Sequence, residues 1–80
     1  MMHRRTIVTH DGMDFAVDTA DIGGKWETMI FRAKKNGDII PSDEYYTERY
    51  DSERKAEEGH ARIVHCVDSI LAEKLGEKCH

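Results

Sequence analysis

A change in hydrophobic periodicity near residue 52 constrains the fold of this chain more than any other feature. From there to residue 75, apolar side chains and one histidine recur at spacings of three and four, the period of one helix face. The members of this stripe are Ala56, His60, Ile63, Val64, Val67, Ile70, Leu71 and Leu75. Asp51 or Ser52 is suited to cap the first turn, and Gly76 lies where a left-handed stop is expected. The sequence therefore predicts a helix over residues 52–75, followed by a tail at 76–80.

The first fifty residues carry β-strand patterns instead. Short segments rich in β-branched and aromatic residues are separated by Gly, Asn and Asp. Two of the separators, Asp11-Gly12 and Asn36-Gly37, are typical of β-hairpin turns, because such turns need the positive φ that Gly adopts. Pro41 lacks an amide donor and belongs at a bulge or an edge. The predicted strands lie near residues 6–10, 14–18, 25–33 and 38–50.

Together these elements predict an α+β domain. We expect an antiparallel meander of three or four strands with one long C-terminal helix packed on one face. A chain of 80 residues is too short for two independent cores, so residues 1–80 are interpreted as a single compact domain. Both faces of the segment 25–33 are largely apolar, which favours a central strand and leaves one apolar face for a partner to cover.

The predicted helix is long for such a sheet. At about 1.5 Å per residue it measures roughly 36 Å, whereas a strand of six to eight residues spans about 20–27 Å. Its last turns, with Ile70, Leu71 and Leu75, are therefore expected to extend past the strands. We predict that these three residues mediate self-association or contact a partner.

Charge and hydropathy exclude some classes of protein. The formal net charge is −4, with 12 Lys and Arg against 16 Asp and Glu, so the positive field that drives nucleic-acid binding is missing. No apolar run approaches the roughly 20 residues of a membrane-spanning helix, and no signal-peptide pattern is seen at the N-terminus. We expect a cytoplasmic chain that binds neither nucleic acid directly nor membranes.

Acidic residues concentrate between positions 38 and 58, where eight Asp and Glu accompany three Lys and Arg. Three tyrosines lie in the same stretch, and tyrosine beside charged groups is typical of protein interfaces. As a binding surface, this region would fit a basic partner, such as the nucleic-acid groove of a host nuclease. The alternative is a solvated face without a partner. The residues predicted to bind are Glu44, Tyr45, Glu48, Asp51, Glu57 and Glu58.

Gly59 and His60 lie in the middle of the predicted helix. Gly costs about 1 kcal/mol there relative to Ala, so Gly59 predicts a close approach between the helix and a bulky strand residue. The candidates for that residue are Trp26, Tyr46 and Tyr50. His60 is expected to hydrogen-bond a strand backbone or a tyrosine hydroxyl. The alternative is a functional His60 that shuttles protons or contacts a ligand, with Glu27 or Glu48 beside it.

The histidines and cysteines give little support to a metal site or to nucleophilic catalysis. His60, His65, Cys66, Cys79 and His80 are ligand types that Zn²⁺ prefers. Their spacing argues against a site, because residues five apart lie about 140° apart around a helix. We interpret His65 as solvated, Cys66 as half-buried and both cysteines as reduced thiols. No nucleophile motif is present, so we predict no metal, no cofactor and no enzymatic activity.

Three segments carry a resemblance to a protein family. They are Trp26-Glu27-Thr28-Met29-Ile30-Phe31, then Glu48-Arg49-Tyr50, then Glu53 through Ala56 followed by Gly59-His60. In these segments, which fall between residue 26 and about residue 64, the chain resembles small phage and prophage proteins of unknown function. The resemblance implies a compact sheet with a helix and a phage or mobile-element origin, and it transfers no activity and no catalytic residue.

These observations lead to one functional hypothesis and two alternatives. We predict a non-enzymatic protein-binding accessory protein of a phage or mobile element, active in the host cytosol. The resemblance and the small acidic character suggest an anti-defence role, as an anti-CRISPR-like inhibitor that occludes a host protein. The first alternative is a structural homodimerising module without an inhibitory target. The second is a small metal-binding or enzymatic domain centred on His60.

Overall fold

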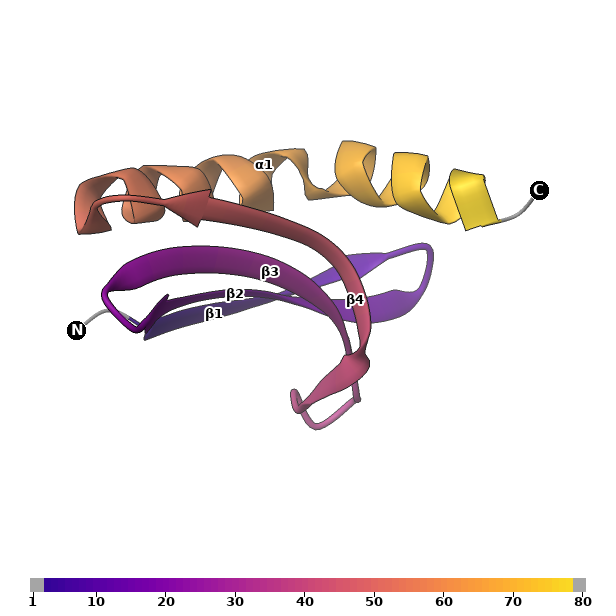
Figure 1. Ribbon diagram of the computed structural model, residues 1–80. Helices are drawn as coiled ribbons and strands as arrows, with labels where there is room; N and C mark the ends of the chain where they lie inside the picture. The colour runs from indigo at the N-terminus through magenta and orange to yellow at the C-terminus, as the bar shows by residue number, and fades with distance from the viewer. Residues whose placement is uncertain (1–2, 79–80) are drawn as a thin grey trace.

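The computed structural model describes residues 3–78 as four strands and one helix. In chain order these are β1 (His3–His10), β2 (Met13–Ile22), β3 (Lys25–Ala33), β4 (Ile39–Tyr50) and α1 (Glu53–Lys78). The strands form one antiparallel sheet in the order β1-β2-β3-β4, and α1 lies across one of its faces (Figure 1). The predicted α+β meander with a long C-terminal helix is confirmed.

The first hairpin follows from its turn residues. Asp11 and Gly12 join β1 to β2 with φ values of 51° and 76°, the positive pair that a type I′ turn requires. Both strands extend beyond the predicted ranges 6–10 and 14–18. The reason is pairing: His3 lies opposite Ala20, and Ala20 lies opposite Glu27 in β3, so ladder hydrogen bonds hold residues whose own β-propensity is low.

β4 is irregular where it passes the end of β3. Ile30 lies opposite Tyr46 and Phe31 opposite Glu44, so Tyr45 is an extra residue at a β-bulge. A second register shift lies between Phe31 and Arg32. It leaves residues 41–43, which include the predicted edge residue Pro41, without partners in the β3 register. Figure 1 shows β4 bending sharply and descending on the side of the sheet opposite α1.

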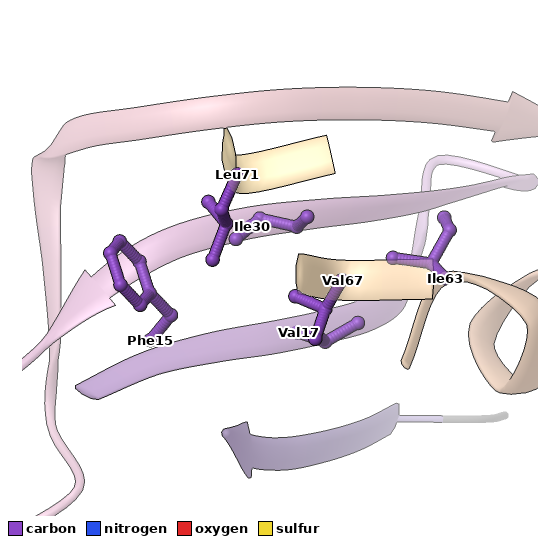
Figure 2. Packing of buried hydrophobic residues seen from close by; sticks show 6 residues of the cluster. All are labelled: Phe15, Val17, Ile30, Ile63, Val67 and Leu71. Carbon is purple, nitrogen blue, oxygen red and sulfur yellow. The ribbon is translucent and has the colours of Figure 1, made fainter. Parts of the chain in front are cut away.

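The core lies between α1 and the sheet. Its buried members are Phe15, Val17, Ile30, Ile63, Val67 and Leu71, three from the strands and three from the helix (Figure 2). Val17 and Ile30 are cross-strand neighbours. The ring of Phe15 packs edge-on against Tyr45 with centroids 5.5 Å apart, and the Arg32 guanidinium lies 5.9 Å from the Phe15 centroid. The bulge thus brings an additional aromatic ring onto the core.

The start of α1 agrees with the prediction, whereas its end does not. At its start, the Ser52 hydroxyl accepts a hydrogen bond from the Lys55 amide at 3.3 Å, which makes Ser52 the N-cap. At its end, the helix continues through Lys78, and Gly76 has no positive φ. The predicted stop at Gly76 and the predicted tail from residue 76 are therefore wrong; residues 79 and 80 lie outside the described range. Leu75 packs against the core, which holds the last turns on the sheet.

The expectation that Ile70, Leu71 and Leu75 extend past the sheet is also wrong. Leu71 is fully buried, and Ile70 and Leu75 are half-buried against the same core. The sheet is longer than assumed, since β2 has 10 residues and β4 has 12. Met13, at the far end of β2, also packs against this cluster. The three residues therefore pack within one copy of the chain, and self-association through them stays a prediction.

Candidate functional site

A chain of polar side chains crosses the interface between α1 and the sheet. His60 is only 3% exposed, and its Nε2 lies 2.8 Å from Thr6 Oγ1 on β1. Its Nδ1 lies 2.6 Å from Thr19 Oγ1 on β2, which lies 2.5 Å from Thr28 Oγ1 on β3. One histidine therefore connects the helix to three strands.

The chemistry of this network suits a neutral imidazole. Burial lowers the pKa of His60 because the charged ring would lose its hydration; the positive charge of Arg4 acts in the same direction, and Asp18 opposes them. A neutral ring offers one donor and one acceptor, and a hydroxyl on each side can satisfy both. The prediction that His60 bonds a strand backbone or a tyrosine is wrong, because threonine hydroxyls are its partners. The signal that the sequence offered was one threonine in each of the first three strands, and the strand register brings these three to the helix-facing side.

Gly59, the neighbour of His60, lies against Tyr50. A Cβ atom at position 59 would overlap the phenol ring of Tyr50. The Tyr50 hydroxyl donates a hydrogen bond to Glu48 Oε2 at 2.7 Å, and Arg62 on α1 donates to the same oxygen. Burial, with the Glu48 carboxylate, raises the pKa of Tyr50 to about 12, although a hydrogen bond with a threonine opposes this. Tyr50 therefore stays protonated and joins the end of β4 to the first turns of α1.

Trp26 and Tyr46, the other two candidates for the Gly59 contact, lie elsewhere on the helix-facing side. Trp26 is the cross-strand neighbour of Tyr50, and Tyr46 is that of Ile30. The indole Nε1 of Trp26 is buried without a hydrogen-bond partner among residues 3–78. Trp26 thus flanks the Tyr50 contact and does not replace it.

Three of the predicted partner-binding residues are engaged within the chain. Tyr45 packs on Phe15 from the bulge, and Glu48 binds the helix as described above. Asp51 Oδ1 lies 3.3 Å from Lys55 Nζ, an ion pair at one turn of helix spacing. Tyr45 and Glu48 thus contribute to the packing of the helix on the sheet.

The other three predicted partner-binding residues are exposed on two different parts of the molecule. Glu57 and Glu58 lie on α1, and Glu44 lies on β4, on the sheet face opposite the helix. Thr47 donates a hydrogen bond to the Glu44 carboxylate. The structure therefore does not bring the six predicted residues together into one surface.

The sheet face opposite α1 has no second layer in the described part of the chain (Figure 1). Across its middle, Ile7, Ala16, Phe31 and Glu44 lie in register from β1 to β4. Ile7 is 45% exposed, whereas Ala16 and Phe31 are buried. Ile7 is therefore the exposed apolar member of this row, on a sheet face that is usually polar when it meets water.

Two groups of ion pairs lie on the same face, both toward the end of the sheet at which β1 begins. The Asp18 carboxylate lies 2.8 Å from His3 Nε2 and 3.4 Å from Arg5 Nη2 on β1. Toward the same end, on β3 and β4, Arg49 Nε lies 2.5 Å from Glu27 Oε2. The uncovered face therefore combines the exposed Ile7 side chain with charged pairs at one end of the sheet.

A shallow open hollow lies on the same face. It is lined by Glu27, Met29, Glu44, Thr47 and Arg49. Met29 was not among the predicted binding residues, and neither was Ile7. The sequence did point to this face of the sheet. Both sides of the segment 25–33 are largely apolar, which indicated that a partner covers the side that the helix does not.

The described residues contain no group of three or more His, Cys, Asp and Glu placed to hold a metal ion. His60 is buried, whereas His65 and Cys66 are exposed on α1, so the prediction of a half-buried Cys66 is wrong. Cys79 and His80 lie outside the described range. Within residues 3–78 there is also no helix with the length and apolar composition needed to cross a membrane.

Fold and site together define a two-layer α+β domain with one uncovered sheet face. No protein-family model, curated protein or solved structure matches the chain. The resemblance to phage proteins therefore stays a prediction, and the geometry of the uncovered face is the main guide to function.

Proposed function

We propose that the chain is a non-enzymatic protein-binding accessory protein that binds its partner through the uncovered sheet face. The observation that carries this proposal is that apolar side chains reach the surface of that face: Ile7 is 45% exposed and Met29 lines a hollow. An antiparallel sheet that ends at water normally alternates apolar inside and polar outside. Exposed apolar side chains with charged pairs nearby are instead typical of a site that a partner covers.

The hollow favours a basic partner. Within it, Arg49 is already paired with Glu27, whereas the Glu44 carboxylate is exposed and accepts a hydrogen bond from the uncharged Thr47 hydroxyl. A partner's Lys or Arg would pack its aliphatic stem on Met29 and place its charge at Glu44. The net charge of −4 favours the approach of such a surface. A nucleic-acid-binding surface of a host protein has this chemistry.

Within this proposal, the resemblance to phage proteins suggests an anti-defence role in the host cytosol. The chain would act as an anti-CRISPR-like inhibitor that occludes a functional surface of its target. Its small size and acidic charge support occlusion, because an acidic domain can compete with nucleic acid for a basic groove. Catalysis receives less support, since the hollow on the uncovered face is open and His60 is not among the residues that line it.

Affinity capture with matched charge variants tests the proposal. Wild-type chain and the variants Met29→Lys, Glu44→Lys and Glu58→Lys are used as bait in lysate of the cells in which the chain naturally acts. Glu44→Lys and Glu58→Lys change the charge equally, but only Glu44 lies on the uncovered face. We expect a partner that is retained by wild type and Glu58→Lys and lost with the other two. A partner captured equally by all four baits would contradict the proposed surface.

A further inference from the structure

We infer that β1 is a self-association edge: two copies pair β1 with β1 in antiparallel orientation about a two-fold axis and form one continuous sheet. This assembly goes beyond the binding surface proposed above, with which it shares the exposed side chain of Ile7. The inference follows from the difference between the two edge strands, from the exposed side chains of β1, and from the charges at its two ends.

The two edges of the sheet are protected differently. β4 carries a bulge at Tyr45 and a proline at position 41, two features that obstruct pairing with another strand. β1 has neither, because all eight of its residues pair with β2 in unbroken register. Within the described range, β2 is the only strand that pairs with β1. The other side of β1 therefore presents a regular row of backbone N–H and C=O groups, to which another strand can hydrogen-bond.

The composition of β1 also favours pairing. Its middle residues Thr6, Ile7, Val8 and Thr9 are all β-branched, and β-branched side chains pack well against cross-strand neighbours. Ile7 is exposed although it lies at the middle of the edge. A second strand beside β1 would cover it.

The charges at the two ends of β1 identify a second copy as the occupant. Basic residues gather at its N-terminal end, and acidic residues gather at the hairpin end. The basic group comprises His3, Arg4 and Arg5, and the acidic group comprises Asp11, Asp14 and Asp68. His3 and Arg5 share one carboxylate, that of Asp18 on β2, so the two arginines still leave this end with a net positive charge. Asp68 belongs to this end because its Oδ1 lies 2.9 Å from His10 Nδ1. Antiparallel pairing about a two-fold axis brings each basic end to the acidic end of the other copy, whereas parallel pairing would place arginine opposite arginine.

One register uses all of these features. With Ile7 on the two-fold axis, Ile7 pairs with Ile7 of the second copy, and both lie on the uncovered face. Arg5 then lies opposite Thr9 of the second copy, whose hydroxyl donates to Asp14 at 3.0 Å. His3 lies opposite Asp11 of the second copy. Arg4 lies opposite His10 of the second copy, whose ring lies between Asp11 and Asp68 of its own chain.

Mass measurement of matched variants provides the first test. We expect wild-type chain in multi-angle light scattering to approach twice the 9.2 kDa chain mass as concentration rises. Ile7→Lys should return it to 9.2 kDa, because two lysines would meet at the axis. Ile22→Lys is the control, since Ile22 is 57% exposed at the β2–β3 turn and away from β1. A wild-type monomer at every concentration would overturn the inference, and so would a dimer that Ile7→Lys leaves intact or that both variants weaken equally.

Disulfide trapping provides a second test that does not depend on the folding of Ile7→Lys. In a Cys66→Ser, Cys79→Ser background, Ile7→Cys should form a symmetric disulfide, because paired Cα atoms about 4.5–5.5 Å apart are within disulfide range. Thr9→Cys is the matched control, as it lies opposite Arg5 of the second copy. Failure of Ile7→Cys to cross-link, or equal cross-linking of Thr9→Cys, would refute this register and edge.

Discussion

Tyr50 lies so close to Gly59 that any side chain at position 59 would overlap its phenol ring. The contact joins the last residue of β4 to the first half of α1, beside the hydrogen bond from Arg62 to Glu48 and the short connection at residues 51–52. Gly59 thus occupies a position where absence of a side chain stabilises the tertiary structure although it weakens the helix.

Replacing this glycine should destabilise the protein. In an open helical position, Gly→Ala stabilises by up to about 1 kcal/mol. At Gly59 the added methyl overlaps Tyr50, and overpacking of this kind costs about 1–3 kcal/mol. Urea unfolding of Gly59→Ala and Gly76→Ala measures the difference. Gly76 is the control in the same helix, because a methyl group added there would meet no neighbouring side chain within 4 Å. Equal effects of the two substitutions would show that the Tyr50 contact is unimportant.

The threonine network should be sensitive to loss of one hydroxyl. Thr19→Val keeps the shape of the side chain but removes the partner of His60 Nδ1 and of the Thr28 hydroxyl, both buried. We expect a loss of about 1–3 kcal/mol in the free energy of unfolding. Thr9→Val, which removes an exposed hydroxyl bonded to Asp14, should change it by no more than about 0.5 kcal/mol. Similar unfolding midpoints for the two variants would contradict a stabilising network.

Acidification should reveal the neutral state of His60. Its pKa is lowered in the folded protein, so below the ordinary value of about 6.5 the unfolded chain binds the proton more readily. The stability that depends on neutral His60 is therefore present above that pH and is lost as the pH falls from about 6.5 toward the folded pKa. Urea midpoints of wild type and His60→Gln across this range provide the measurement. The other histidines are common to both proteins, so identical pH profiles would show that His60 is not responsible.

Alkaline titration should identify Tyr50. Its pKa is raised to about 12, so one phenol should ionise later than an ordinary tyrosine in absorbance titration, and Tyr50→Phe should remove that step. Glu48→Gln should lower the pKa, because the carboxylate raises it. Glu58→Gln, an equal charge change on the exposed side of α1, is the control. Since the folded pKa is the higher one, stability from this group should fall as the pH rises from about 10 toward 12. An unchanged titration in Glu48→Gln would contradict the Tyr50–Glu48 hydrogen bond.

The parts of this fold that depend on neighbours in the chain were readable from the amino-acid sequence. The stripe from Ala56 to Leu75 and the Asp11-Gly12 turn are such features, because helix period and turn conformation depend on residues a few positions apart. The need for a small residue at Gly59 was also visible. Its contact was not, since choosing Tyr50 over Trp26 requires the strand register.

Contacts between distant residues decided the rest. The bulge at Tyr45, the threonine partners of His60 and the burial of Leu71 all depend on how strands align and where the helix lies on them. Packing of Leu75 likewise carries the helix through Gly76 against its local preference. Such interactions join residues far apart in the chain, as between Thr6 and His60, which are 54 positions apart. Only the folded arrangement determines them, because local pattern contains no information about which distant side chains meet.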